Sequence, residues 1–295
     1  MTVDGFMNKI EDLKSSIYLL WFGRSVSVTC VKKETEYSYK IYTSENLIYH
    51  YPKDYGTCFI FVDKQLDAIA KGHLAIDREL NDIYNYLKNE RQVDYLVHFT
   101  NIKNLSSILK RGILPRNDDS IKNIIIYSDE NRLDYMPECS CFTISFPNYK
   151  MFSRKWIYDN PTNEIYVVLE VSIDVLLSDG VIKAYFTPTN AAASEMVDIE
   201  ERTHLTDVKR MFGNIVGKDG KDIVRDPSLP SQYTTDPQAE VLLEGIVNPK
   251  YIKRVNYRQP ENKELFNLNY VVLDRIEQRI DYTFFAPRAD YENWK

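Results

Sequence analysis

Apolar positions along the chain change their spacing in a way that separates two parts. Residues 25–31 (SVSVTCV) and 55–62 (YGTCFIFV) are short runs rich in β-branched and aromatic residues between polar turns, as is typical of strands. Apolar residues then recur at the spacing of one helical face, at Leu80, Ile83, Tyr84 and Leu87, before a charged break. We therefore expect a small N-terminal α+β domain over residues 1–90, with an accessory or regulatory role, and a second domain over residues 91–295.

The second domain opens with a strand followed by a helix with recognisable ends. Residues 93–100 (VDYLVHFT) have the composition of a strand. In the helix that follows, Thr100 or Asn101 can cap the N-terminus, an apolar stripe recurs at three-to-four spacing, and Gly112 is the expected left-handed stop. This order places His98 at the end of a strand.

The rest of the chain mixes strands, a long loop and a helical run. Strand-like runs occur at residues 141–146, 165–173 and 240–247, and residues 261–279 have a helical pattern. This irregular order favours an α+β fold over a regular βαβ repeat. Residues 213–237 are rich in Gly, Asp, Pro and Ser, which predicts a long and functional loop leading into the last strand-like run.

Composition places the protein among soluble globular proteins. A hydrophobic content of 44% over 295 residues is enough for a core. No run approaches the ~20 apolar residues of a membrane span, and the N-terminus lacks a signal-peptide pattern, so we expect a cytoplasmic protein without a membrane partner. The four cysteines lack a second pair at metal-ligand spacing, so we expect no metal site.

The charge balance restricts how the protein can meet nucleic acid. A formal net charge of −6 is unlike that of proteins that coat nucleic acid, so any such partner must be contacted by local basic patches, for example at Lys209 and Arg210. Aromatic side chains can stack on bases. Candidates are Tyr149, Phe152, Trp156 and Tyr233, although core packing also explains each of them.

Three polar features carry candidate chemistry, and each also has a structural interpretation. His98 is either a ligand-binding residue or a core histidine. Gln238 and Glu240 stand two residues apart, so they share one face of a strand and point either into a cleft or into solvent. Arg132 with Asp134 can equally be a surface ion pair.

Taken together, four segments resemble the DarT family of DNA-modifying ADP-ribosyltransferases. They are YLVHFTNIKNLSSILKRGILPR, then RLDY followed by CFTISFPNYKMFSRKW, then FTPTNAAASEM, and finally DPQAEVLLEGIV. The resemblance covers residues 95–295 and does not extend to the N-terminal domain. It implies a mixed or antiparallel split β-sheet with flanking helices, and NAD as the co-substrate.

The resemblance also assigns the dinucleotide contacts. His98 and Thr100 are expected to hold the nicotinamide riboside half of NAD⁺ through a ring nitrogen and a hydroxyl. Asn101 and Asn104 are close enough along the chain to reach the dinucleotide, although helix capping also explains Asn101.

An essential arginine of the family corresponds to Arg132, which we expect to act in catalysis and in NAD binding. A permanently charged, bidentate donor suits a pyrophosphate or a carboxylate that must stay oriented. Arg116 and Arg154 are rivals for this role, because the alignment is loose between the helix and the CFTISF strand.

Glu240 is the expected catalytic carboxylate. Breaking the nicotinamide–ribose bond builds positive charge on the sugar, which a carboxylate stabilises, and the same group can take a proton from the attacking base. The residues expected to bind the substrate are Gln238, Tyr233, Asn148 and Arg154. Because a base inside a duplex is hidden, the expected substrate is single-stranded.

The segment Thr187–Ser194 has two interpretations. Thr189 or Asn190 followed by alanines is a typical helix N-terminus, whereas the resemblance makes the segment an edge of the NAD pocket.

The function implied by the resemblance is that of a toxin from a toxin–antitoxin or phage-defence system, which modifies guanine or thymine in single-stranded DNA. An mRNA base, a protein acceptor and a non-catalytic NAD- or nucleic-acid-binding module are the alternatives. A toxin implies a cognate antitoxin, either an ADP-ribosyl hydrolase or a binding protein.

Overall fold

The computed structural model of the chain describes residues 28–35, 38–43, 48–52, 78–122, 124–127, 133–153, 164–178, 180–193, 199–216, 222–267 and 276–290. Two compact units make up the chain, Met1–Asn81 and Asp82–Lys295. The division falls inside a helix whose described part is residues 78–90, ahead of the boundary expected at residue 90. The second unit begins before residue 90 because Tyr86 and Leu87 are buried in it, and the Tyr86 ring lies 6.1 Å from the ring of Phe212.

The described part of the first unit is a three-stranded antiparallel sheet. Its strands, in sheet order, are β1 (Val28–Thr35), β2 (Ser38–Thr43) and β3 (Ile48–Pro52). Strand β1 overlaps the run predicted at residues 25–31. The run predicted at residues 55–62 lies outside the described residues.

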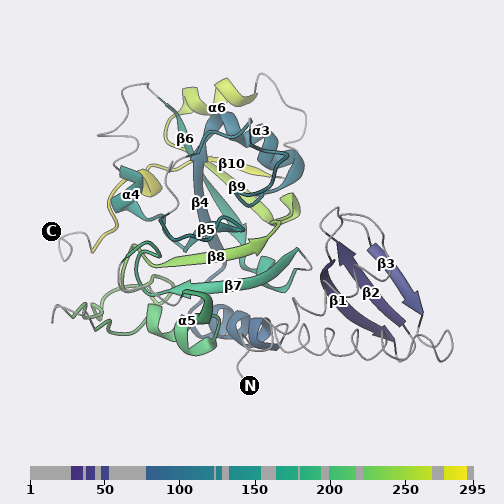
Figure 1. The fold of residues 1–295 in the computed structure, drawn as a ribbon. Helices are drawn as coiled ribbons and strands as arrows, with labels where there is room; N and C mark the ends of the chain where they lie inside the picture. The colour runs from purple at the N-terminus through teal and green to yellow at the C-terminus, as the bar shows by residue number, and fades with distance from the viewer. Residues whose placement is uncertain are drawn as a thin grey trace. The chain divides into compact units, whose positions relative to one another are not determined.

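The second unit is built on a seven-stranded sheet (Figure 1). All neighbouring strands in it are antiparallel except β10 and β9, which are parallel. This sheet and its flanking helices confirm the predicted α+β fold class, and β4, β5, β6 and β8 confirm the four strands predicted in this part of the chain. The sheet order is β10 (Glu277–Ile280), β9 (Ile252–Tyr257), β6 (Tyr166–Ser172), β4 (Tyr95–Asn101), β5 (Cys139–Ile144), β8 (Glu240–Gly245) and β7 (Val181–Thr187).

The sheet divides between β4 and β5. These two strands share the pairs Leu96 with Ile144 and Val97 with Thr143. Beyond them, β4 continues along β6, whereas the other half of β5 pairs with β8. The two halves of the sheet therefore separate from His98 onwards, which gives the split sheet that the family resemblance implies.

Helix α3 (Ile102–Arg111) follows β4 and has both caps at the predicted residues, although Gly112, with a ψ of 179°, is not in the αL conformation expected. The side-chain oxygen of Asn101 accepts a hydrogen bond from the Lys103 amide at 3.0 Å, and Gly112 ends the helix with a φ of 94°. The other elements of this unit are α4 (Tyr149–Ser153), α5 (Leu205–Met211), α6 (Pro260–Asn267), the π-helical turn η2 (Tyr86–Glu90) and the 3-10 turns η4 (Ile173–Leu177), η5 (Ile199–Glu201), η6 (Pro249–Tyr251) and η8 (Thr283–Phe285). None of the described helices is long and apolar enough to cross a membrane.

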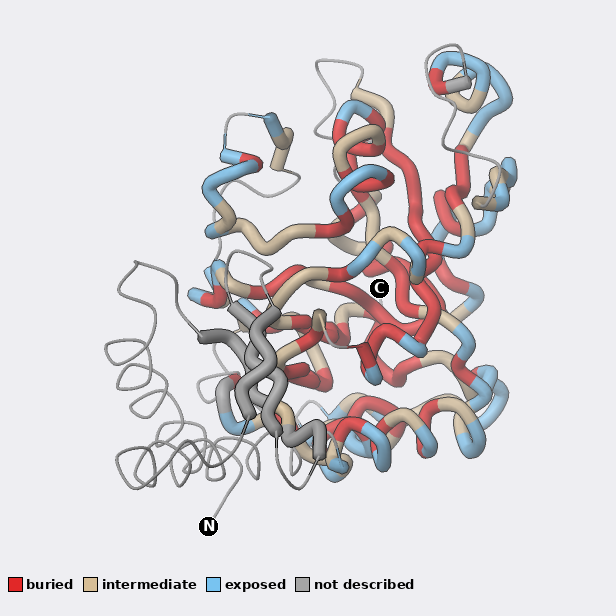
Figure 2. The backbone as a smooth tube through the Cα atoms, turned by 90° about the vertical axis from the view of Figure 1, so that its right-hand side faces the viewer, coloured by how far each residue is buried: buried red, intermediate tan, exposed pale blue. Residues whose placement is uncertain are grey.

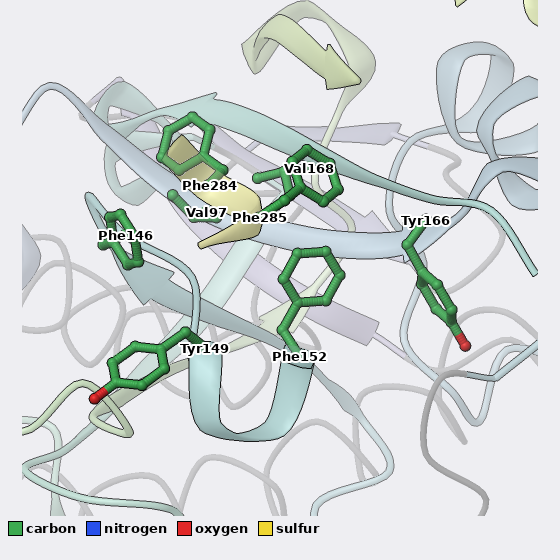
Figure 3. Close-up of a cluster of buried hydrophobic side chains, with 8 residues drawn as sticks. All are labelled: Val97, Phe146, Tyr149, Phe152, Tyr166, Val168, Phe284 and Phe285. Carbon is green, nitrogen blue, oxygen red and sulfur yellow. The ribbon is translucent and has the colours of Figure 1, made fainter. Parts of the chain in front are cut away.

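Burial is concentrated in the central strands, which form the red part of the tube in Figure 2. An aromatic cluster lies on one face of β4 and β6 (Figure 3), where Phe285 of η8 meets Phe152 of α4 and Phe284 meets Phe146. Tyr95 and Phe99 pack against this cluster from β4. Because side chains alternate along a strand, His98 and Thr100 point to the opposite face, where α3 lies.

Two sequence predictions are corrected here. The helix predicted over residues 261–279 ends at Asn267, and residues 277–280 form the edge strand β10 instead. The polar residues Glu277, Gln278 and Arg279 form a strand through their pairing with β9, which overrides the local helical pattern. In Thr187–Ser194, the described residues form a turn and not a helix start, with the Ala192 amide donating to the Asn190 side chain at 2.8 Å.

Candidate active site

A cleft of about 370 Å³ opens where the two halves of the sheet separate. It is lined by residues of β4, β5 and β8, by α3 and the segment that follows it, and by the turn after β7. His98, Thr100, Asn148 and Glu240 all line this cleft. The structure thus brings together four residues predicted from distant parts of the sequence.

His98 bridges the two halves of the divided sheet. Its Nδ1 lies 2.8 Å from the carbonyl oxygen of Cys141 on β5, and its ring centroid lies 5.4 Å from that of Phe142. Because a carbonyl oxygen is only an acceptor, we assign the proton to Nδ1, which leaves Nε2 as an acceptor. Burial lowers the pKa of His98, against the effect of the bond to Cys141. At neutral pH the ring is therefore uncharged and can accept a hydrogen bond from a hydroxyl or an amide.

Thr100 is held in place by Asn104. The Asn104 Nδ2 donates to the Thr100 hydroxyl at 3.0 Å and to the Ile126 carbonyl at 2.7 Å, and its Oδ1 accepts from the Ile126 amide at 2.8 Å. Both amide protons of Asn104 are thereby used. The Asn104 side chain thereby holds the main chain at Ile126, which lines the cleft. The Thr100 hydroxyl can still donate its own proton.

Glu240 is the first residue of β8 and is 9% exposed. Its Oε2 accepts a hydrogen bond from the backbone amide of Ala191 at 2.9 Å. Its main-chain oxygen accepts from the Thr187 hydroxyl at 3.3 Å. The turn after β7 therefore fixes the orientation of the carboxylate, as expected for a group that must stabilise positive charge on a substrate.

Asp236 ties this turn to the loop before β8. One of its carboxylate oxygens accepts from the Thr189 hydroxyl at 2.6 Å and the other from the Gln238 amide at 2.8 Å. Asp236 is 1% exposed, and its burial raises the pKa of the carboxyl, although the two hydrogen bonds oppose that rise.

Two arginines hold the loop predicted at residues 213–237, whose described residues contain neither a helix nor an extended strand. Arg225 donates to the carbonyls of Tyr233 at 2.7 Å and Pro230 at 2.9 Å. Arg288 is 2% exposed and donates to the carbonyls of Thr234 at 2.8 Å and Thr235 at 3.0 Å. These hydrogen bonds fix the conformation of the loop that leads to Glu240 at the cleft.

Two buried polar atoms of the cleft residues have no hydrogen-bond partner among the residues that the structure describes. They are the hydroxyl oxygen of Thr143 and the Nδ2 of Asn148. An unsatisfied buried polar group costs about 1–3 kcal/mol, so a bound polar molecule would restore what these atoms lack. Together with the neutral Nε2 of His98, they fit a ligand rich in hydroxyls and amides.

The remaining predicted site residues are placed differently. Asn101 is 1% exposed, caps α3 and is not among the residues lining the cleft. Gln238 lies in the turn before β8, so strand periodicity does not put it beside Glu240. Tyr233 packs in the aromatic cluster, 5.7 Å from Phe146 between ring centroids. Their roles in binding stay predictions.

The arginine assignment also stays a prediction. Arg132 and Arg154 lie outside the described residues. Arg116, the third candidate, lines the cleft with its guanidinium 4.3 Å above the ring of Tyr127.

Sequence reasoning missed Thr143 and the pair Thr189 and Asp236. Thr143 stands in an apolar strand, where one hydroxyl gives no signal. Asp236 lies in the DPQAEVLLEGIV segment, but its bond to Thr189 joins residues 47 positions apart, which no local pattern reveals.

Comparisons with known proteins identify the family. The family profile described as ssDNA thymidine ADP-ribosyltransferase, DarT, matches residues 97–284. Among curated proteins, nothing matches. Among solved structures, Thermosipho africanus DarTG in complex with ADP-ribose is 20% identical with a TM-score of 0.42, over 65% of this chain and 51% of that one. The chain thus spans about half the length of that protein.

Two further structures are of DarT from Thermus sp. 2.9. The complex with NAD⁺ is 15% identical with a TM-score of 0.39, over 65% of this chain and 98% of that one. The complex with ADP-ribosylated ssDNA is 15% identical with a TM-score of 0.41, over 65% and 96%. Since the family profile spans the divided sheet and the cleft from Val97 to Phe284, the chain belongs to the DarT family.

Proposed function

We propose that this protein transfers ADP-ribose from NAD⁺ to thymine in single-stranded DNA. The observation that supports this most directly is the cleft in which the anchored carboxylate of Glu240 and the neutral ring of His98 line one space. Membership of a family described as ssDNA thymidine ADP-ribosyltransferases selects thymine over guanine, the other base expected from the sequence.

NAD⁺ fits this cleft as the co-substrate. Its ribose hydroxyls and its carboxamide donate hydrogen bonds, which the Nε2 of His98 can accept. Its carbonyl and ribose oxygens can accept from the Thr100 hydroxyl and from the Nδ2 of Asn148, which has no other partner among the described residues. These three residues would hold the nicotinamide riboside half in one orientation, which is the main requirement for reaction at its anomeric carbon.

Glu240 acts on both partners of the transfer. As the bond between the anomeric carbon and the nicotinamide nitrogen breaks, positive charge develops on the ribose and the carboxylate stabilises it. Thymine N1 carries the deoxyribose, so N3 is the ring nitrogen that can attack. The N3 proton passes to Glu240, the new bond joins N3 to the anomeric carbon, and nicotinamide leaves neutral.

A single strand is the natural form of this acceptor. N3 of thymine is paired and stacked inside a duplex, and exposing it costs a few kcal/mol that a single strand does not require. The loop held by Arg225 and Arg288 leads directly to Glu240 and is the surface on which such a strand can be presented.

The proposed function is tested with labelled NAD⁺ offered to single-stranded DNA, RNA and protein. The wild type should label single-stranded DNA, and nucleoside mass spectrometry should show ADP-ribose on thymidine, while Glu240→Gln gives no label. Label on guanosine or on RNA would replace the base or the polymer in this proposal. A wild type that labels no polymer would overturn the enzymatic function itself.

We further propose that the protein acts as a toxin in the cytoplasm and is opposed by an antitoxin, either an ADP-ribosyl hydrolase or a binding protein. ADP-ribosylated thymine cannot pair, since N3 takes part in Watson–Crick pairing, so the modification would block replication. Expression of the wild type should stop growth, and co-expression of a hydrolase that removes ADP-ribose from DNA should restore it. Growth unaffected by the active wild type would contradict a toxin.

A further inference from the structure

Three cationic side chains gather around two buried aromatic rings, away from the cleft. The Arg91 guanidinium lies 4.3 Å above the Phe212 ring, and that of Arg225 lies 6.0 Å from the same ring. The Lys209 ammonium lies 5.4 Å from the ring of Tyr86. We call Arg91, Lys209 and Arg225 the Arg91 cluster.

Arg91 differs from other arginines of this unit in its hydrogen bonding. Arg225 and Arg288 donate to carbonyl groups of the loop, and Arg288 also makes an ion pair with Asp290 at 2.6 Å. The Nε and Nη2 atoms of Arg91, in contrast, are buried and have no partner among the described residues. Buried, unsatisfied donors of a charged group are costly, and an anion that accepts from them would remove that cost.

The charges around Arg91 also favour the binding of an anion. Burial lowers the pKa of Arg225, and the charges of Arg91 and Arg288 lower it further, so these cations repel one another. Lys209 adds an exposed ammonium. In a protein with a net charge of −6, such a cluster is a local positive region that can attract a polyanion.

The cluster is joined to the loop that leads to Glu240. The Ser231 hydroxyl donates to the carbonyl of Arg91 at 3.2 Å, and Arg225 donates to the carbonyl of Tyr233 at 2.7 Å. From Tyr233 the chain runs through Asp236 to Glu240 at the cleft. A strand bound along this loop would therefore pass from the cluster to the reactive carboxylate.

We propose that the Arg91 cluster binds backbone phosphates of the single-stranded DNA whose base is modified, at a distance from that base. The inference rests on the proposed function. Arg91 precedes the matched family region, residues 97–284, whereas Lys209 and Arg225 lie within it. Phe212 and Tyr86 keep the cations in position before the strand arrives, which lowers the entropy cost of binding.

Binding as a function of salt tests this inference. Single-stranded DNA of about 20 nucleotides is titrated with the full-length protein between about 50 and 300 mM NaCl, for wild type, Arg91→Met and Lys209→Gln. Met keeps an apolar contact with Phe212 without the charge. Each lost phosphate contact should lower the slope of log affinity against log salt by about 0.7 and weaken binding several-fold.

The matched control is Lys253→Gln, which removes one exposed lysine from β9. It should bind like the wild type. An oligonucleotide of about 5 nucleotides offers fewer phosphates, so its modification should differ less between the four proteins than that of the longer one. Lys209 is exposed, so its substitution keeps the test valid if Arg91→Met unfolds.

The outcomes separate the two proposals. If the wild type labels DNA while Arg91→Met and Lys209→Gln keep the wild-type salt slope with the longer oligonucleotide, the cluster does not bind phosphate and the proposed function stands. If the wild type neither binds nor labels DNA of either length, the proposed function fails and this inference fails with it.

Discussion

The Nδ1 of His98 and the carbonyl oxygen of Cys141 lie 2.8 Å apart, across the point where β4 and β5 separate. At this position a side chain replaces the main-chain pairing that the divided sheet has lost. The same hydrogen bond fixes the tautomer of the ring, because it places the proton on Nδ1. This one hydrogen bond therefore links β4 to β5 where their main-chain pairing ends, and it leaves Nε2 as a hydrogen-bond acceptor in the cleft.

This contact predicts how activity depends on pH. Burial lowers the pKa of His98 from its ordinary value, so the neutral ring predominates at neutral pH and is lost only as the pH falls through the lowered pKa. Protonation turns Nε2 from an acceptor into a donor, so the KM for NAD⁺ should rise in that acidic range. Measured between about pH 5 and 8, the KM of His98→Asn, which keeps a donor toward Cys141 but lacks Nε2, should be high and independent of pH. A KM of His98→Asn equal to that of the wild type at about pH 8 would exclude Nε2 as an acceptor for NAD⁺.

Substituting Glu240 should remove catalysis and spare NAD⁺ binding. Gln at this position can still accept from the Ala191 amide but cannot stabilise positive charge or take a proton. We expect kcat to fall by at least about 100-fold, with the Kd for NAD⁺ changed by less than about threefold. The control is Glu244→Gln on the same strand, which binds the Tyr185 hydroxyl at 3.0 Å and does not line the cleft. A comparable loss in Glu244→Gln would show that β8 is merely sensitive to substitution.

Much of the fold followed from local patterns in the sequence. The caps of α3 at Asn101 and Gly112 were predictable because capping depends on the few residues at each helix end. The edge strand β10 was not predictable, since its charged residues Glu277 and Arg279 become strand only by pairing with β9. Tertiary pairing overrode the local helical pattern there.

The sequence predicted those parts of the site whose chemistry depends on a single residue. His98 and Glu240 were found through motifs, and both line the cleft. The placement of Gln238 was wrong because the turn around Asp236 ends one residue before β8, so strand periodicity does not reach it. The supporting contacts of Asn104 with Ile126 and of Thr189 with Asp236 depend on the folded chain and leave no spacing to detect.

Asp236 is predicted to be a positioning residue for Glu240. Asp236→Ala removes the acceptor for Thr189 and Gln238, which should loosen the turn that carries Ala191 and lower kcat by about tenfold or more, with NAD⁺ binding retained. Asp236→Asn should restore most of the activity, because its oxygen accepts from Gln238 and its amide can donate to Thr189. Equal loss in both variants would instead point to a need for the charge.

The same residue has a consequence for stability. Burial raises the pKa of Asp236 above its ordinary value, so the folded state loses stability as the pH rises from the ordinary to the raised pKa, and the whole cost is present above the raised pKa. Asp236→Asn should therefore be more stable relative to the wild type at neutral pH than in acid. Urea unfolding at both pH values measures the difference, and a relative stability independent of pH would contradict it.

Gly112→Ala should destabilise the wall of the cleft. Gly112 has a φ of 94°, and an added Cβ would lie 2.3 Å from the carbonyl oxygen of Val247. We expect a loss of about 1–3 kcal/mol or more in urea unfolding. The control is Gly213→Ala, where the nearest atom would lie at 3.6 Å, and it should stay within about 0.5 kcal/mol of the wild type. Equal losses in the two variants would show that left-handed geometry is not the cause.

Arg288 is expected to contribute both to the stability of the protein and to the position of the loop at residues 213–237. Its side chain makes two hydrogen bonds of 2.6 Å to Asp290 and donates to the carbonyls of Thr234 and Thr235. Arg288→Met removes the ion pair with Asp290, whose side chain is 8% exposed, and this should cost about 3–5 kcal/mol. In Arg288→Met with Asp290→Asn the carboxylate charge is gone as well, so part of that stability should return, while the hydrogen bonds to the loop stay absent. The double variant should therefore be folded yet modify DNA poorly at saturating NAD⁺, whereas full recovery of both properties would show that Arg288 serves only to neutralise Asp290.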